Sequence, residues 1–154
     1  MHRALALGVA VNVVVVTIVA IGLFGFHVTP AFAQQTDTLA PLQGRWMVTA
    51  GEHNGAPMDA LNGGVMAIDG AAFEISTASG NVLTGTFEVE ASMRPKHLDL
   101  LHANGTRWEA VFEVDGTVLR LNYVDASGVD PRPTGFKTLP TNEESLIVLN
   151  REGQ

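Results

Sequence analysis

Histidine and aspartate side chains near one strand-like segment are the candidates for metal binding in this chain. His97 and Asp99 are two positions apart, so a β-strand places both on one face. His102 is five positions from His97 and falls on the opposite face, while His53 precedes an Asn54-Gly55 turn. Two ligands are too few for a zinc site, and the chain has no cysteine. We therefore expect no metal site, and we interpret His97 and Asp99 as part of a solvent-facing strand.

Other catalytic patterns are also missing from the sequence. The serines of the predicted domain include Ser76, Ser79, Ser92, Ser127 and Ser145. None of them lies in a Gly-x-Ser-x-Gly or Ser-x-x-Lys motif. The carboxylate pairs Glu88/Glu90 and Glu109/Glu113 fall on outward faces, where solvated charge is the ordinary explanation. We therefore predict a protein that is not an enzyme and needs no cofactor.

A glycine, a tryptophan and an arginine at the two ends of the predicted domain indicate how it closes. Gly44-Arg45-Trp46 opens the first strand-like segment, and Arg151 ends the last one. A guanidinium over an indole face gains roughly 0.5–2 kcal/mol of cation–π attraction. We predict that Gly44, Trp46 and Arg151 form a structural closure of one barrel and are not a functional site.

Alternating apolar residues and glycine-containing turns divide the chain between these ends into short strands. In the segment 107–115, Trp108, Ala110 and Phe112 fall on one face, while Arg107 and Glu109 fall on the other. A helical turn is expected only near residues 58–62, across one mouth of the barrel. The predicted strands cover residues 44–52, 64–69, 71–77, 82–91, 96–102, 107–115, 117–125, 134–139 and 145–151.

A sheet of this size must hide its edges, and closure into an antiparallel up-and-down β-barrel of about eight strands does so. A two-sheet sandwich is the competing architecture. The inward-facing aromatic residues are Phe73, Phe87, Trp108, Phe112 and Tyr123. If they leave a void, the interior is an apolar cup for a small hydrophobic ligand. If they fill it, the domain is a structural or protein-interaction module of the cell envelope.

The N-terminal segment has the pattern of a secretory signal peptide. A short basic start precedes an apolar stretch over residues 4–26, and Ala31-Phe32-Ala33 matches a cleavage site. We predict a signal peptide at 1–33, a polar linker at 34–41 and a barrel domain at 42–154. The protein is then exported, to the periplasm or outside the cell. An uncleaved membrane anchor at residues 4–26 is the alternative.

The charge of the exported portion limits its partners. Arg3 is the only charged residue among the first 33 positions, so the remainder carries eight basic and sixteen acidic residues, a formal charge of −8. Nucleic acid and anionic lipid surfaces are therefore disfavoured as partners. A membrane contact is expected only if the N-terminal segment stays attached.

An ordered set of motifs between Leu42 and Arg151 carries a resemblance to a known family. The motifs are Leu42-Gln43-Gly44-x-Trp46, Gly85-Thr86-Phe87, Pro95-Lys96-His97-Leu98-Asp99-Leu100, Phe112-Glu113-Val114-Asp115-Gly116, Arg132-Pro133-Thr134, Phe136-Lys137-Thr138 and Leu146-Ile147-Val148-Leu149 before Arg151. Together they resemble the lipocalin-like domain family expanded in the Planctomycetes. The resemblance implies a calycin-type barrel without an established activity, and it supplies no catalytic residues. It also implies that Trp46 packs at the closed end beneath Arg151.

Overall fold

The computed structural model describes residues 38–153 of the chain. The predicted signal peptide, residues 1–33, lies outside the described residues, as does the first half of the predicted linker, residues 34–37. Within residues 38–153, no helix is long and apolar enough to cross a membrane.

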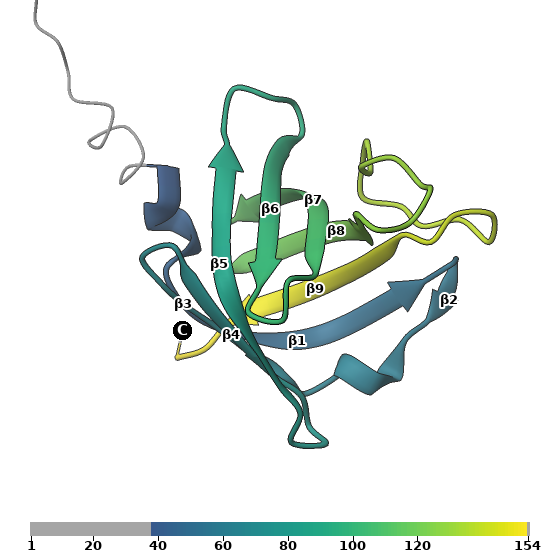
Figure 1. Ribbon diagram of the computed structural model, residues 1–154. Helices are drawn as coiled ribbons and strands as arrows, with labels where there is room; N and C mark the ends of the chain where they lie inside the picture. Colours follow the sequence, from purple (N-terminus) through teal and green to yellow (C-terminus); the bar gives the residue numbers. More distant parts are fainter. Residues whose placement is uncertain (1–37, 154) are drawn as a thin grey trace, which may run out of the picture.

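The described chain forms a closed antiparallel barrel of eight strands (Figure 1). Each strand pairs with the next along the chain, and β1 also pairs with β9, which closes the sheet. The eight strands are β1 (Gly44–His53), β3 (Val65–Asp69), β4 (Ala72–Ser76), β5 (Val82–Glu90), β6 (Lys96–His102), β7 (Arg107–Asp115), β8 (Val118–Asp125) and β9 (Ser145–Arg151). The predicted barrel is confirmed, and the sandwich is not adopted.

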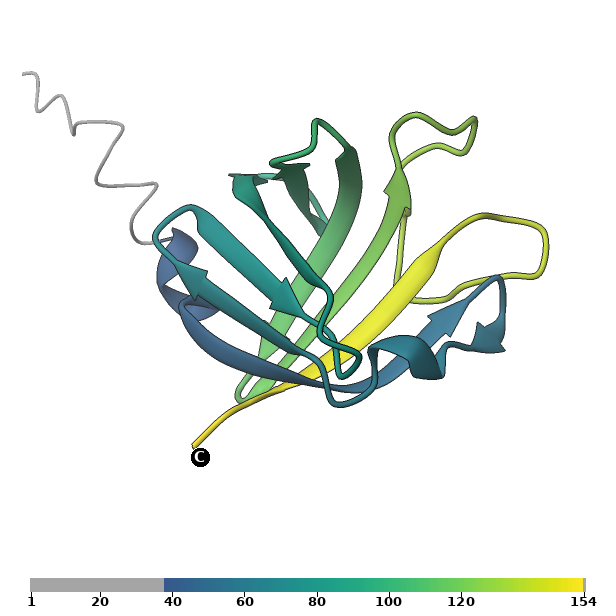
Figure 2. The ribbon, with the colours of Figure 1, turned by 60° about the horizontal axis from the view of Figure 1, so that its bottom comes forward.

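Three short elements complete the barrel at its ends. The two-residue strand β2 (Ala56–Pro57) pairs with the last residues of β1. The 3₁₀ turn η2 (Asp59–Leu61) follows it and confirms the helical turn expected near residues 58–62. A second 3₁₀ turn, η1 (Ala40–Leu42), was not expected; it precedes β1 and places Leu42 in the core, where it is 1% exposed. Figure 2 shows η1 and η2 at different ends of β1.

The alternation of apolar and polar residues fills the barrel interior with side chains. In β4, Phe73 and Ile75 are buried while Glu74 between them is exposed. In β6, Leu98 and Leu100 are buried, again with a less buried residue between them. Because successive strand residues point to opposite faces, this pattern separates an apolar interior from a wet exterior.

Glycine is required where two strands approach most closely. A Cβ atom built on Gly85 in β5 would lie 2.1 Å from the carbonyl oxygen of Leu101 in β6 and 2.9 Å from the ring of Phe73. No side chain fits at that position without moving backbone atoms. Gly85 therefore lets β4, β5 and β6 curve tightly around the interior.

One predicted strand, residues 134–139, is wrong. Residues 126–144 form a long connection without strand or helix between β8 and β9. Pro131 and Pro133 lack the N–H that a sheet ladder needs, and Pro140 ends the segment on the other side. In addition, β8 pairs directly with β9, so no position in the barrel remains for another strand. We call residues 126–144 the strap.

The closed end of the barrel is built around Trp46 and Arg151. Trp46 is fully buried, and its indole N–H donates to the carbonyl of Leu42 at 2.8 Å. The guanidinium carbon of Arg151 lies 4.1 Å from the centroid of the Trp46 ring. Arg151 also donates to the carbonyls of Gln43 and Pro41, the latter at 2.7 Å. It thereby joins β9 to the segment that enters β1.

Removing this arginine should destabilise the whole barrel. Arg151→Ala loses the cation–π contact and two charge-assisted hydrogen bonds, so we expect the free energy of unfolding to fall by about 1–3 kcal/mol. The measurement is chemical or thermal unfolding followed by circular dichroism. Arg45→Ala is the matched control, because the side chain of Arg45 forms an ion pair with Glu152 at the surface and is 60% exposed. Equal losses in the two variants would contradict a structural role for Arg151.

Candidate functional site

A row of aromatic rings crosses the interior toward the end of the barrel opposite Trp46. The ring centroids of Phe73 and His102 are 5.2 Å apart, and those of His102 and Trp108 are 4.1 Å apart, both edge to face. Trp108 then stacks on Tyr123 at 4.3 Å with an interplanar angle of 16°. The four residues come from β4, β6, β7 and β8, so the row ties half of the barrel together.

The structure places the five predicted interior residues on the inward face. Phe73, Phe87 and Phe112 are almost completely buried, and Tyr123 is 8% exposed. Trp108 is only half-buried, although it packs against the core. These residues pack against one another and against aliphatic neighbours, as a filled interior requires. Trp108 is the most exposed member of the row.

Sequence reasoning considered His102 only as a metal ligand and missed its place in this row. The sequence does indicate this position: Leu98 and Leu100 are inward-facing, and the same alternation puts residue 102 on the inward face. His102 is 6% exposed, and its Nε2 has no hydrogen-bond partner among the described residues. Burial lowers the pKa of His102 by disfavouring the charged ring, while the nearby Asp125 carboxylate partly raises it.

A cleft of about 270 Å³ opens at this mouth beside the stacked pair. Its floor contains Trp108 and Tyr123. Its walls come from the ends of β1, β8 and β9 and from the strap. The complete lining consists of His53, Trp108, Tyr123, Val124, Asp125, Ser127, Gly128, Asp130, Glu143 and Ser145. Strands and strap therefore share in building one site.

A hydrogen-bonded row of polar side chains runs along one wall of the cleft. The Tyr123 hydroxyl is hydrogen-bonded to Ser145, and burial raises the pKa of Tyr123, so the phenol stays protonated. Ser145 Oγ lies 2.8 Å from His53 Nδ1. His53 Nε2 lies 3.6 Å from a carboxylate oxygen of Glu143. The row joins β8, β9, β1 and the strap.

The contact of Ser145 with His53 has the residue types of a nucleophile and its base. Ser145, however, pairs with both Tyr123 and His53 within the sheet. Backbone N–H groups in such a ladder point along the sheet and not toward a bound carbonyl. The strap N–H of Ser127 is also used, because it donates to Asp125 at 2.8 Å. The geometry therefore suits hydrogen bonding to a ligand better than acyl transfer, which needs oxyanion donors.

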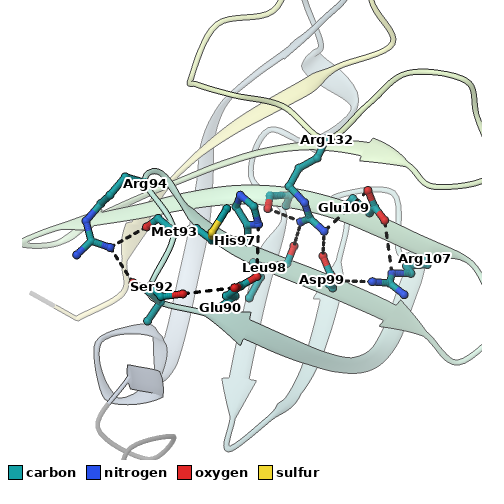
Figure 3. Close-up of polar contacts among 12 residues, drawn as sticks. Glu90, Ser92, Met93, Arg94, His97, Leu98, Asp99, Arg107, Glu109 and Arg132 are labelled. Atoms are coloured by element: carbon teal, nitrogen blue, oxygen red, sulfur yellow. Dashed lines mark hydrogen bonds and ion pairs between the residues drawn. The ribbon is translucent and has the colours of Figure 1, made fainter.

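The strap is held against the outer wall of the barrel by Arg132. One guanidinium nitrogen donates to the carbonyl of Ala110 at 2.8 Å, and the other pairs with Asp99 and lies 3.8 Å from Glu109 (Figure 3). Arg107 pairs with Asp99 from the other side. The side chains of Asp99 and Arg132 are only 14% and 19% exposed. Arg132 therefore anchors the strap through partly desolvated charges.

Two further side chains, with two hydrogen bonds each, hold the strap against the barrel. Asn122 of β8 is fully buried, and its side-chain nitrogen donates to the carbonyl of Gly135 and to Glu144, both at 2.8 Å. Thr138 donates to Glu52 at 2.6 Å and accepts from the backbone N–H of Gly55 at 3.0 Å. These bonds explain how a segment without regular structure keeps one conformation.

The predicted solvent-facing strand pair, His97 and Asp99, lies on the outer face of β6. His97 is 3.8 Å from Glu90 of β5, and Asp99 belongs to the strap anchor. No group of three or more potential metal-ligating side chains occurs within residues 38–153.

A larger groove, of about 900 Å³, lies on the outer surface across β3 to β6. Its floor has small side chains, including Ala67, Ala72 and Ala103, together with Leu101. Its lining also includes Phe73 and His102 of the aromatic row. Sequence analysis assigned this face to solvent and did not identify the groove.

Comparison with known proteins adds little about activity. No protein-family model matches the chain, and no curated protein matches it. Among solved structures, the chain is similar to a de novo designed fluorescence-activating β-barrel, with 15% sequence identity and a TM-score of 0.45. The match covers 75% of this chain and 98% of the designed one. At this level, the likeness concerns the barrel alone.

Loss of the strap anchor should loosen the cleft wall and destabilise the protein. Arg132→Met leaves Asp99 partly buried without this partner, so we expect a loss of up to about 3 kcal/mol in the free energy of unfolding. Hydrogen exchange should accelerate in residues 126–144 and much less in the strands. The control is Arg94→Met, since Arg94 donates only to carbonyls of its own turn, those of Ala91 and Met93. Unchanged exchange in the strap would contradict the role of Arg132.

Acid should weaken the barrel partly through His102. The pKa of His102 is lowered in the folded state, whereas an unfolded histidine titrates near about 6.5. The unfolded chain then binds more protons below that pH, so this contribution to stability is present above it and is lost as the pH falls. His102→Leu should show a smaller loss of stability than the wild type between about pH 7 and 5 in denaturant titrations. If the free energy of unfolding fell with pH equally steeply in the wild type and in His102→Leu, the acid sensitivity would not come from His102.

Proposed function

We propose that the protein is an exported, non-enzymatic binding module that holds one small ring-bearing molecule at the mouth of its barrel. The observation that carries the proposal is that the aromatic row fills the interior but leaves Trp108 half-buried beside an open cleft. This differs from the apolar cup inside the barrel considered from the sequence. Export is supported by the signal-like pattern of residues 1–33.

The dimensions and lining of the cleft support a small ligand. Its volume of about 270 Å³ is close to the lower end of the range of about 300–1,000 Å³ for ligand pockets. Trp108 and Tyr123 offer flat apolar contact area, and aromatic rings prefer to stack on such surfaces. Ser145 and His53 supply hydrogen-bonding groups on the adjacent wall. A flat apolar floor with a few polar groups is the usual composition of a ligand site.

A second candidate is a protein-interaction module that uses the outer groove across β3 to β6. The size of that groove favours this function. So do the small apolar side chains on its floor, which face water when no partner is bound. The filled interior is compatible with this function too. The groove and the cleft share no lining residue, so the two candidates can be separated by where binding occurs.

The two tryptophans report on opposite ends of the barrel and provide the test. Trp46 is sealed beneath Arg151, whereas Trp108 lines the cleft. Titration with indole or phenol should shift the indole N–H resonance of Trp108 in a ¹H–¹⁵N NMR spectrum and leave that of Trp46 in place. Ser145→Ala should weaken binding severalfold, by about 1 kcal/mol for one lost hydrogen bond.

Leu101→Ser is the matched control, because it alters the outer groove and not the cleft. It should leave the response of Trp108 unchanged. An unshifted Trp108 at millimolar concentrations of both probes would refute the mouth site. Shifts confined to Leu101 and Ala103 would favour the second candidate instead.

A further inference from the structure

The charges around the mouth cleft are all of one sign. Its lining includes the carboxylates of Asp125, Asp130 and Glu143, and none of the described lining residues is Lys or Arg. His53 is the remaining titratable group on the polar wall, next to Glu143. The nearby Arg107 points to the outer face, where it pairs with Asp99.

Two of these carboxylates accept hydrogen bonds from backbone N–H groups. Asp125 accepts a hydrogen bond from the Ser127 N–H, which lowers the pKa of the carboxyl group. Asp130 accepts one from the Glu143 N–H at 2.8 Å. Hydrogen bonds from neutral N–H groups stabilise these anions but do not neutralise them. The cleft therefore has a negative potential at neutral pH.

The floor of the cleft adds a second attraction for positive charge. Tryptophan binds cations best among the aromatic side chains, and Trp108 is half-buried at the cleft, with the ring centroids of His102 and Tyr123 4.1 and 4.3 Å away. An indole face attracts ammonium groups by about 0.5–2 kcal/mol, more as water is excluded. A neutral ring gains only stacking from this floor, and an anion is repelled by the walls.

We infer that the ligand of the mouth cleft is a small organic cation, an aromatic amine or quaternary ammonium compound, held between the Trp108–Tyr123 pair and the acidic wall. The inference rests on the proposed function and names the ligand class of that same site. Recognition combines stacking on the floor with charge complementarity from Asp125, Asp130 and Glu143. The polar row through Ser145 orients a hydroxyl or N–H group of the ligand.

Three probes that share one ring and differ in charge test the inference. They are benzyltrimethylammonium, benzyl alcohol and benzoate, each titrated into the protein while the Trp108 and Trp46 indole resonances are followed. The cation should bind about tenfold more tightly than the alcohol. Benzoate should bind most weakly. Added salt should weaken binding of the cation and not of the alcohol. Salt screens the attraction between charges, and the screening length is about 8 Å at physiological ionic strength and shorter at higher salt.

A charge-neutral variant isolates the acidic wall. Glu143→Gln should lower the affinity for the cation about threefold and leave that for benzyl alcohol unchanged. The side chain of Glu143 is 72% exposed, so folding should not suffer. Glu113→Gln on the outer face, where Glu113 pairs with Arg120, makes the same charge change away from the cleft and should have no effect.

The possible outcomes distinguish a wrong ligand class from a wrong binding site. If benzyl alcohol or benzoate binds at Trp108 as tightly as the cation, the cation class is wrong while the binding site stands. If none of the three probes shifts Trp108, the mouth site itself is refuted, and the inference with it. If Glu143→Gln and Glu113→Gln act equally, the attraction comes from the net charge of the protein and not from the cleft.

Discussion

Pairing of β1 with β9 is the constraint on which the rest of the structure depends. Once that seam forms, every strand of the barrel has two neighbours and the sheet has no free edge. Eight strands also fix an interior just wide enough for side chains to fill. Trp46 and Arg151 lie at one end of the seam, where the arginine binds carbonyls that the sheet leaves unpaired.

A filled interior decides where binding can occur. The aromatic row from Phe73 to Tyr123 uses the inner space for packing, and the cleft and the groove lie at the rim and on the outer wall. Strand ends and the strap meet at the rim. The strap does not have to follow the alternation of inward apolar and outward polar residues that a barrel strand requires. Trp108 and Tyr123 belong both to the packed row and to the cleft, while the other cleft walls come from strand ends and the strap.

Most of the barrel could be predicted from the sequence because alternation and glycine turns are local signals. The bounds of β6, β7 and β9 are reproduced to the residue. Residues 134–139 misled this reasoning, since their pattern resembles a strand although the direct pairing of β8 with β9 leaves no place for one. The mouth cleft could not be predicted, because it depends on how the strap folds back, and that is fixed by distant partners such as Asp99 and Glu52.

The strap connects two strands that are already neighbours in the barrel. Closure therefore does not depend on the length or sequence of residues 126–144, provided that the ends of β8 and β9 stay where they are. A different connection between the same two strands would give the cleft a new wall while keeping the β1–β9 seam, although the contacts that Arg132 and Asn122 make between strap and barrel would be lost. The seam that closes the barrel and the segment that shapes the cleft are therefore separate parts of the chain.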